Sequence, residues 1–177
     1  MKFIIVFITG FFSLFSNEGS FYDIEIMKPD GQKISMASFS NKKIIITAIS
    51  TSNPDYGYLK YLNYLQSQNS SLVIIAVPAI DFGGEINYER VKGIRDSLPL
   101  NIIITQPGYI KKTKGNSQQI LFKWLTRVEE NSHFDTDVET TDQLYVISES
   151  GVLYAVLQKP VTSEVIEQVL KQQDIKN

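Results

Sequence analysis

Cysteine is absent from this sequence of 177 residues, and histidine occurs only once. Without a thiol, the chain cannot form a disulfide, bind a metal through thiolates or use cysteine as a nucleophile. It also cannot carry a lipid on an N-terminal cysteine. These absences exclude most of the redox chemistry that small α/β domains perform with paired cysteines.

A large net charge is also missing. The formal net charge is -2, and lysines alternate with acidic residues, so there is no long block of one sign. A chain of this kind is not expected to bind nucleic acid. Its length predicts one domain with a substantial apolar core.

The most apolar run is N-terminal, from Phe3 to Phe15, and it follows Met1 and Lys2. This run is short for a bilayer span but suits the apolar part of a secretory signal. We therefore predict a signal peptide or short membrane anchor over residues 1–20 and a folded domain over residues 21–177. The protein would then be exported to the periplasm or outside the cell, or held at a membrane through residues 3–15.

The central feature of the predicted domain is an isoleucine-rich strand, Lys43 to Ile49, of the type that is buried on both faces. Asn53 is a suitable N-cap for a following helix that runs to Gln68. Leu72 to Val77 predicts a second buried strand. A strand, a helix and a strand at this spacing form a βαβ unit with parallel strands.

The remaining periodicities predict an α/β fold with a central mixed sheet, flanking helices and an N-terminal β-hairpin. The expected hairpin consists of Phe21–Ile26 and Lys33–Ser35. The expected helices cover Asn87–Ser97, Ser117–Glu129 and a segment from Thr162 or Ser163. The further strands are Ile102–Thr105, Gln143–Ser148 and Val152–Leu157.

This order of elements is that of a thioredoxin-like fold, and several stretches resemble the glutathione peroxidase family. The resemblance covers Phe21 to about Leu170. The stretches that carry it are Phe21–Ile34 with its Asp30-Gly31 turn, Lys42–Ser50, Val77–Gly84, Gly115–Leu125 and Thr162–Glu167. Val77–Gly84 is similar to the Phe-Pro-Cys-Asn-Gln-Phe-Gly-Gly signature of that family.

In the same resemblance, this sequence has different residue types at the positions of the family's catalytic residues. The peroxide-reducing cysteine or selenocysteine falls on Ser52, and the glutamine falls on Asp81. The Trp-Asn pair falls on Thr140 and Thr141. The resolving cysteine of many members would fall at Ala79 or in the helix after it, where no thiol exists.

Peroxide reduction needs an attacking atom that ionises and oxidises easily, as a thiolate does. The hydroxyl of Ser52 does neither, and a carboxylate at Asp81 would oppose a nearby anion. We therefore expect a catalytically inactive binding or scaffold module for an unknown protein or small molecule, without a cofactor. Ser52, Asp81, Thr140 and Thr141 would line its vestigial site.

Two alternative functions stay open. The chain could reduce peroxides with the thiol of a partner protein. It could instead be a hydrolase that uses Ser52 as nucleophile, although the Gly-x-Ser-x-Gly elbow is missing and its only histidine is His133.

A weak candidate for a divalent metal site is the alternating set His133, Asp135, Asp137 and Glu139. In an extended segment these four side chains would point the same way. A solvated acidic loop is the preferred interpretation, because the set lacks the glycine of an EF-hand loop.

Overall fold

A computed structural model describes residues 19–82, 88–96, 101–158 and 161–172. The strands within these ranges are β1 (Glu25–Met27), β2 (Lys33–Ser35), β3 (Lys43–Ile49), β4 (Leu72–Pro78), β5 (Ile103–Ile104), β6 (Leu144–Ile147) and β7 (Leu153–Leu157). The α-helices are α1 (Tyr56–Gln68), α2 (Tyr88–Asp96), α3 (Ile120–Thr126), α4 (Val128–Asn131) and α5 (Ser163–Lys171). Short 3-10 turns are η1 (Phe21–Asp23), η2 (Met36–Phe39), η3 (Ile80–Phe82) and η4 (Lys112–Ser117).

The central sheet has the strand order β5-β4-β3-β6-β7. β3 is parallel to β4 and antiparallel to β6, so the sheet is mixed. β1 and β2 pair antiparallel as a separate hairpin. These pairings confirm the predicted mixed sheet, βαβ unit and N-terminal hairpin.

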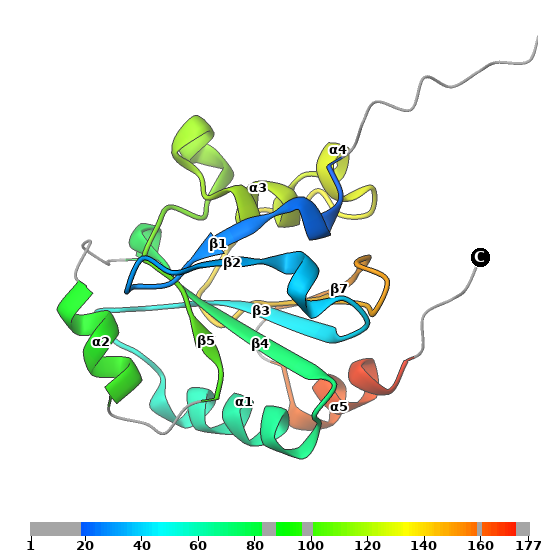
Figure 1. Ribbon diagram of the computed structural model, residues 1–177, viewed down its shortest axis with the longest axis horizontal. Helices are drawn as coiled ribbons and strands as arrows, with labels where there is room; N and C mark the ends of the chain where they lie inside the picture. The colour runs from blue at the N-terminus through cyan, green and yellow to red at the C-terminus, as the bar shows by residue number, and fades with distance from the viewer. Residues whose placement is uncertain (1–18, 83–87, 97–100, 159–160, 173–177) are drawn as a thin grey trace, which may run out of the picture.

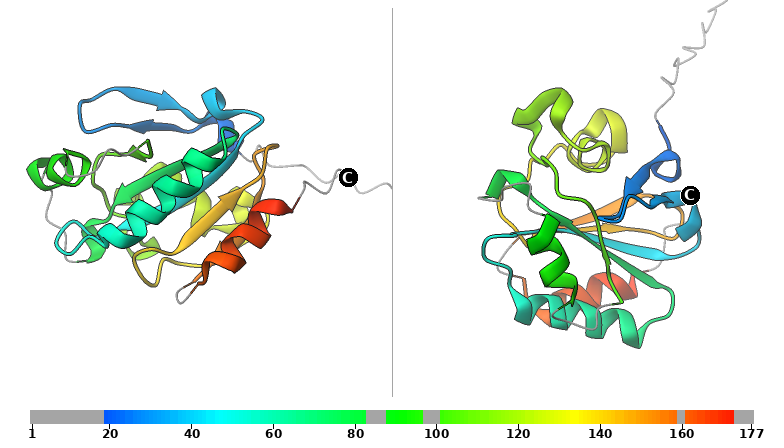
Figure 2. Two further views of the ribbon diagram at one scale, coloured as in Figure 1. Left: turned by 90° about the horizontal axis from the view of Figure 1, so that it is seen from below. Right: turned by 60° about the vertical axis from the view of Figure 1, so that its left-hand side comes forward.

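β3 separates two apolar cores. Its residues Ile44, Ile46 and Ala48 belong to the core under the hairpin and α3, whereas Ile45 and Ile49 belong to the core under α1, α2 and α5. Figures 1 and 2 show the corresponding layers, with α1 and α5 on one face of the sheet and the hairpin and α3 on the other. The two-residue repeat of a strand directs alternate side chains into each core.

The start of α1 differs from the prediction. Asp55, not Asn53, is the N-cap, and its Oδ1 accepts a hydrogen bond of 2.9 Å from the N–H of Tyr58. The N–H of Asn53 donates instead to Oγ of Ser50, which keeps Asn53 within the turn that follows β3. The helix therefore begins at Tyr56, with the carboxylate of Asp55 as its cap.

The predicted helix over Ser117–Glu129 is also divided. α3 and α4 are separated by Arg127, which has extended backbone angles (φ -121, ψ 124). The hydroxyl of Thr126 donates to the carbonyl of Phe122 and accepts from the amide of Gln118. Thr126 is the last residue of α3, and these bonds give its buried hydroxyl both a donor and an acceptor at the helix end.

The predicted signal or anchor segment lies, up to residue 18, outside the described residues. Gly83 and Gly84 of the signature-like stretch lie outside them too. Within the ranges that are described, no helix combines the length and the apolar character needed to cross a bilayer.

Lys43, at the start of β3, connects the sheet to the end of α5. The residue is only 7% exposed, and its Nζ donates to the carbonyl oxygens of Leu170 (2.7 Å) and Gln172. A carboxylate oxygen of Glu149 lies 3.9 Å from the same nitrogen. The ammonium group therefore caps the C-terminal end of α5, where the helix dipole favours a cation.

We predict that Lys43→Met lowers the free energy of unfolding by about 2–3 kcal/mol, because hydrogen bonds from a charged donor are lost. Urea unfolding followed by circular dichroism measures this change. Lys42→Met is the matched control and should cost less than about 0.5 kcal/mol. Equal effects of the two substitutions would contradict the proposed cap.

Candidate functional site

Ser52 follows the carboxyl end of β3 and is exposed. Its Oγ lies 3.1 Å from Oγ of Ser50. Nδ1 of His133 is instead within 2.9 Å of the carbonyl oxygen of Asn131. In the described part of the chain, Ser52 has a hydroxyl neighbour and makes no hydrogen bond to an imidazole, which is the base that a serine nucleophile needs.

The topology brings the four predicted site residues to one edge of the sheet. β3 and β4 are parallel, so Ser52 and Asp81 both follow strand ends at that edge. Thr140 and Thr141 precede β6, which is antiparallel to β3 and begins there. However, no hydrogen bond or ion pair between any two of the four is present in the described part of the chain.

Asp81 has other partners. Its side chain is 1% exposed, and its Oδ2 accepts hydrogen bonds from the backbone N–H groups of Ile110 (2.6 Å) and Lys111 (3.2 Å). Nζ of Lys114 lies 3.7 Å from Oδ1. A buried carboxylate needs such charged and N–H partners. Asp81 therefore holds the segment from Ile110 to Lys114 against the end of β4.

Tyr58 and Asp142 lie at the same edge, and the sequence did not single them out as site residues. The hydroxyl of Tyr58 donates to the carbonyl oxygen of Asp142 (3.2 Å), and the N–H of Asp142 donates to the carbonyl oxygen of Ala48 (2.7 Å). The hydroxyl of Thr141 lies 3.5 Å from a carboxylate oxygen of Asp142. In the sequence, Tyr58 is one of several tyrosines with helical spacing, which are more often core residues than residues at the mouth of a pocket.

Two carboxylates of the alternating set at residues 133–139 contact Lys112, at the start of η4. The carboxylate of Asp135 pairs with Nζ of Lys112, and this bond lowers the pKa of Asp135. Oδ1 of Asp137 accepts the backbone N–H of Lys112 at 2.9 Å. Among the described residues, no group of three or more histidine or acidic side chains is placed to hold a metal ion.

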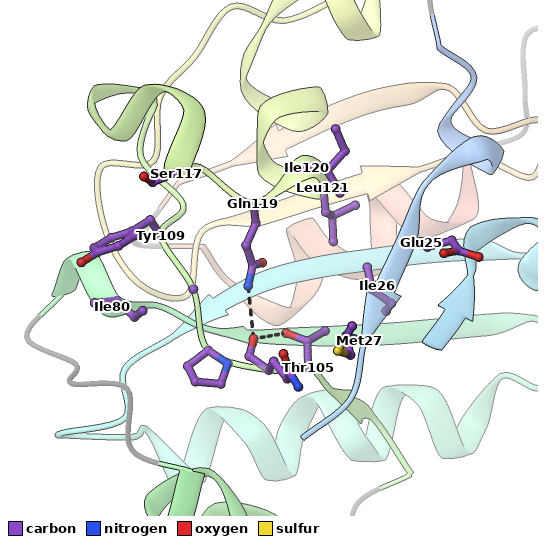
Figure 3. A pocket seen from close by; sticks show the side chains of 13 residues that line it. Glu25, Ile26, Met27, Ile80, Thr105, Tyr109, Ser117, Gln119, Ile120 and Leu121 are labelled. Atoms are coloured by element: carbon purple, nitrogen blue, oxygen red, sulfur yellow. Dashed lines mark hydrogen bonds between the residues drawn. The ribbon is translucent and has the colours of Figure 1, made fainter. Parts of the chain in front are cut away.

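A hollow of about 370 Å³ lies beside this edge, between β1 and the segments 105–109 and 117–121. Figure 3 shows Met27 and Ile26 on one side and Gln119 and Leu121 on the other. Nε2 of Gln119 donates to the carbonyl oxygen of Gln106 (3.2 Å). A Cβ at Gly108 would lie 2.2 Å from that nitrogen, so a larger residue there would displace the side chain of Gln119. The sequence did not predict this hollow.

We predict that Asp81→Ala lowers the free energy of unfolding by about 2–4 kcal/mol, because two buried backbone N–H groups lose a charged acceptor. Urea unfolding is the measurement. Asp135→Ala, which removes an exposed carboxylate paired with a lysine of the same segment, should change stability little. If both variants unfold at the same denaturant concentration, Asp81 does not hold the segment.

Burial, and then the charge of Asp142, raises the pKa of Tyr58 above its ordinary value of 10.0. Burial likewise raises the pKa of Tyr145. Above about pH 10 the unfolded chain loses these protons and the folded chain keeps them, so stability that is full below pH 10 falls as the pH rises. Urea unfolding between about pH 9 and 11 should show this loss, with a smaller slope in Tyr58→Phe. Tyr64→Phe, at a position 58% exposed, should keep the slope of the unmodified protein.

Comparison with known proteins gives no match to a family model and none to a curated protein sequence. Solved structures do match. The glutathione peroxidases Trgpx, in apo form, and T. cruzi GPX1 are each 12% identical, with a TM-score of 0.64 over 85% of this chain and 93% and 94% of theirs. A thioredoxin-family thiol:disulfide interchange protein of Chlorobium tepidum TLS is 18% identical, with a TM-score of 0.57 over 84% of this chain and 90% of its own. Likeness at such low identity establishes the architecture and not the activity. The chain has a thioredoxin-like fold, as its sequence predicted.

Proposed function

We propose that the protein is an exported, glutathione-peroxidase-like module that binds a partner and does not reduce peroxides. The observation that carries this proposal is the replacement of the thiol by Ser52 in a chain without any cysteine. An alkoxide does not pass through the sulfenic acid that a peroxidatic cysteine forms and that a second thiol reduces.

The surroundings of Ser52 support the same conclusion. The carboxylate of Asp55 caps α1 close to position 52 in the chain, and a negative charge there disfavours a second anion. Asp81, at the position of the family's glutamine, is engaged with backbone N–H groups of another segment. Its side chain is therefore not available as a donor to a reacting oxygen.

Among the described residues, no contact specifically supports either of the two alternative functions. A peroxidase that uses a partner's thiol would still need an oxidisable atom of its own to connect peroxide and thiol. A hydrolase based on Ser52 would need a base, and His133 is bonded to the backbone of Asn131.

The test is a peroxide assay on the purified protein, in which oxidation of NADPH is coupled to reduction of thioredoxin or of glutathione. We predict no turnover above buffer. Ser52→Cys should stay within about tenfold of Ser70→Cys, which carries an exposed cysteine in the turn after α1, because one unit of thiol pKa changes the thiolate fraction about tenfold.

Turnover by the unmodified protein would overturn the proposal directly. Much faster turnover in Ser52→Cys than in Ser70→Cys would show that the surroundings of position 52 still support peroxide chemistry. The proposed loss of function would then rest on one atom and not on the whole site.

A further inference from the structure

Two hollows lie side by side along the outer edge of β1. The first, of about 370 Å³, extends from Glu25 and Met27 to Pro107 and Tyr109. The second, of about 390 Å³, extends from Glu25 to Gly19 and Trp124. Glu25 and Ile120 line both hollows, so together they form one groove between β1 and α3. We call it the β1 groove.

One wall of the β1 groove is a free strand edge. The N–H of Met36 donates to the carbonyl of Ile24, and the N–H of Lys28 donates to the carbonyl of Gln32, so residues 24, 26 and 28 face β2. In an antiparallel pair, the alternate residues Glu25 and Met27 direct their backbone groups away from the partner strand. The carbonyl of Met27 accepts from the N–H of Gln106 (2.8 Å). In the described ranges, the N–H and carbonyl of Glu25 have no backbone partner.

The opposite wall is apolar and partly open to solvent. On this wall, Ile120 in the first turn of α3 is 56% exposed, and the buried residues Leu121 and Trp124 of the same helix also line the groove. On the facing wall, Met27 of β1 is 38% exposed. Figure 3 shows Ile120 and Leu121 across the hollow from β1. An extended chain that paired with Glu25 would place its alternate side chains against this wall.

The charges at the groove select among such chains. Asp23, Glu25 and Glu130 line the second hollow, and none of the described residues that line it is a lysine or arginine. Glu25 and Glu130 pair with lysines outside the hollow, at 3.2 Å each, and these are exposed pairs that are weakly held. A cationic side chain near Glu25 complements this end of the groove.

We propose that the β1 groove binds an extended peptide by strand addition to Glu25, with apolar side chains on Ile120 and a lysine or arginine beside the three carboxylates. This site is separate from Ser52 and goes beyond the proposed function. It would operate whether or not peroxide is turned over.

The experiment uses the fluorescence of Trp124, the one tryptophan of the chain, which lines the groove. The probe is a hexapeptide blocked at both ends, with arginine followed by alternating isoleucine and threonine. We expect a saturable change in Trp124 emission. A peptide with glutamate in place of arginine should bind at least about fivefold more weakly, since an ion pair at an exposed site contributes up to about 1 kcal/mol.

Variants test the apolar contact, the charge and the strand hydrogen bonds of the proposal separately. Ile120→Asp should weaken binding about tenfold or more through loss of the apolar contact, whereas Val165→Asp, at a 40% exposed position on α5, should have no effect. Glu25→Gln removes only the charge. Glu25→Pro also removes the N–H that faces the groove, and it should bind about fivefold more weakly than Glu25→Gln.

Proline should be tolerated at position 25, because Ile24 has extended backbone angles (φ -76, ψ 135) and the lost N–H does not pair with β2. If that variant fails to fold, a probe methylated on its backbone nitrogens tests the same hydrogen bonds on the unmodified protein. Equal binding of methylated and unmethylated probes would overturn strand addition.

Absence of any change in Trp124 emission with the arginine probe would overturn the proposal as a whole. So would a dimer, detected by sedimentation, that Ile120→Asp dissociates, because the occupant would then be a second copy of this chain. Failure in these experiments leaves the peroxide assay unaffected, so the two proposals can be judged separately.

Discussion

The burial of β3 on both faces is the constraint on which the rest of the structure depends. Each buried isoleucine contributes about 1.5–3 kcal/mol, and β3 directs such side chains into both cores. Its parallel pairing with β4 and antiparallel pairing with β6 then fix which segments meet at one edge. Ser52, Asp81 and the two threonines before β6 reach that edge for this reason alone.

Asp81 shows how one buried charge organises a segment far along the chain. A carboxylate with 1% exposure must find partners, and it finds them in the backbone N–H groups of Ile110 and Lys111. The segment that it holds continues from Gly108 and Tyr109, which line the β1 groove. Asp81 therefore supports one wall of the β1 groove through the segment that it holds.

Much of the fold was predictable because its signals are local. The apolar run of β3, the second apolar run of β4 and the strand–helix–strand spacing that joins them each depend on neighbours in sequence, and all are present. The two wrong predictions concern the start of α1 and the end of α3, where a polar group has more than one possible hydrogen-bond partner. The backbone N–H of Asn53 donates to Ser50, and Asp55 is the N-cap of α1. Helix α3 ends at Thr126, whose hydroxyl accepts from the side chain of Gln118.

The sequence by itself determined that the chain offers no thiol and that its strands and helices follow a thioredoxin-like order. Only the tertiary structure decided what its polar side chains contact. Asp81 bonds to a residue 29 positions away, and the β1 groove forms where a hairpin meets a helix far along the chain. Periodicity records which face of an element is buried, but the partner of a polar group depends on the approach of distant segments.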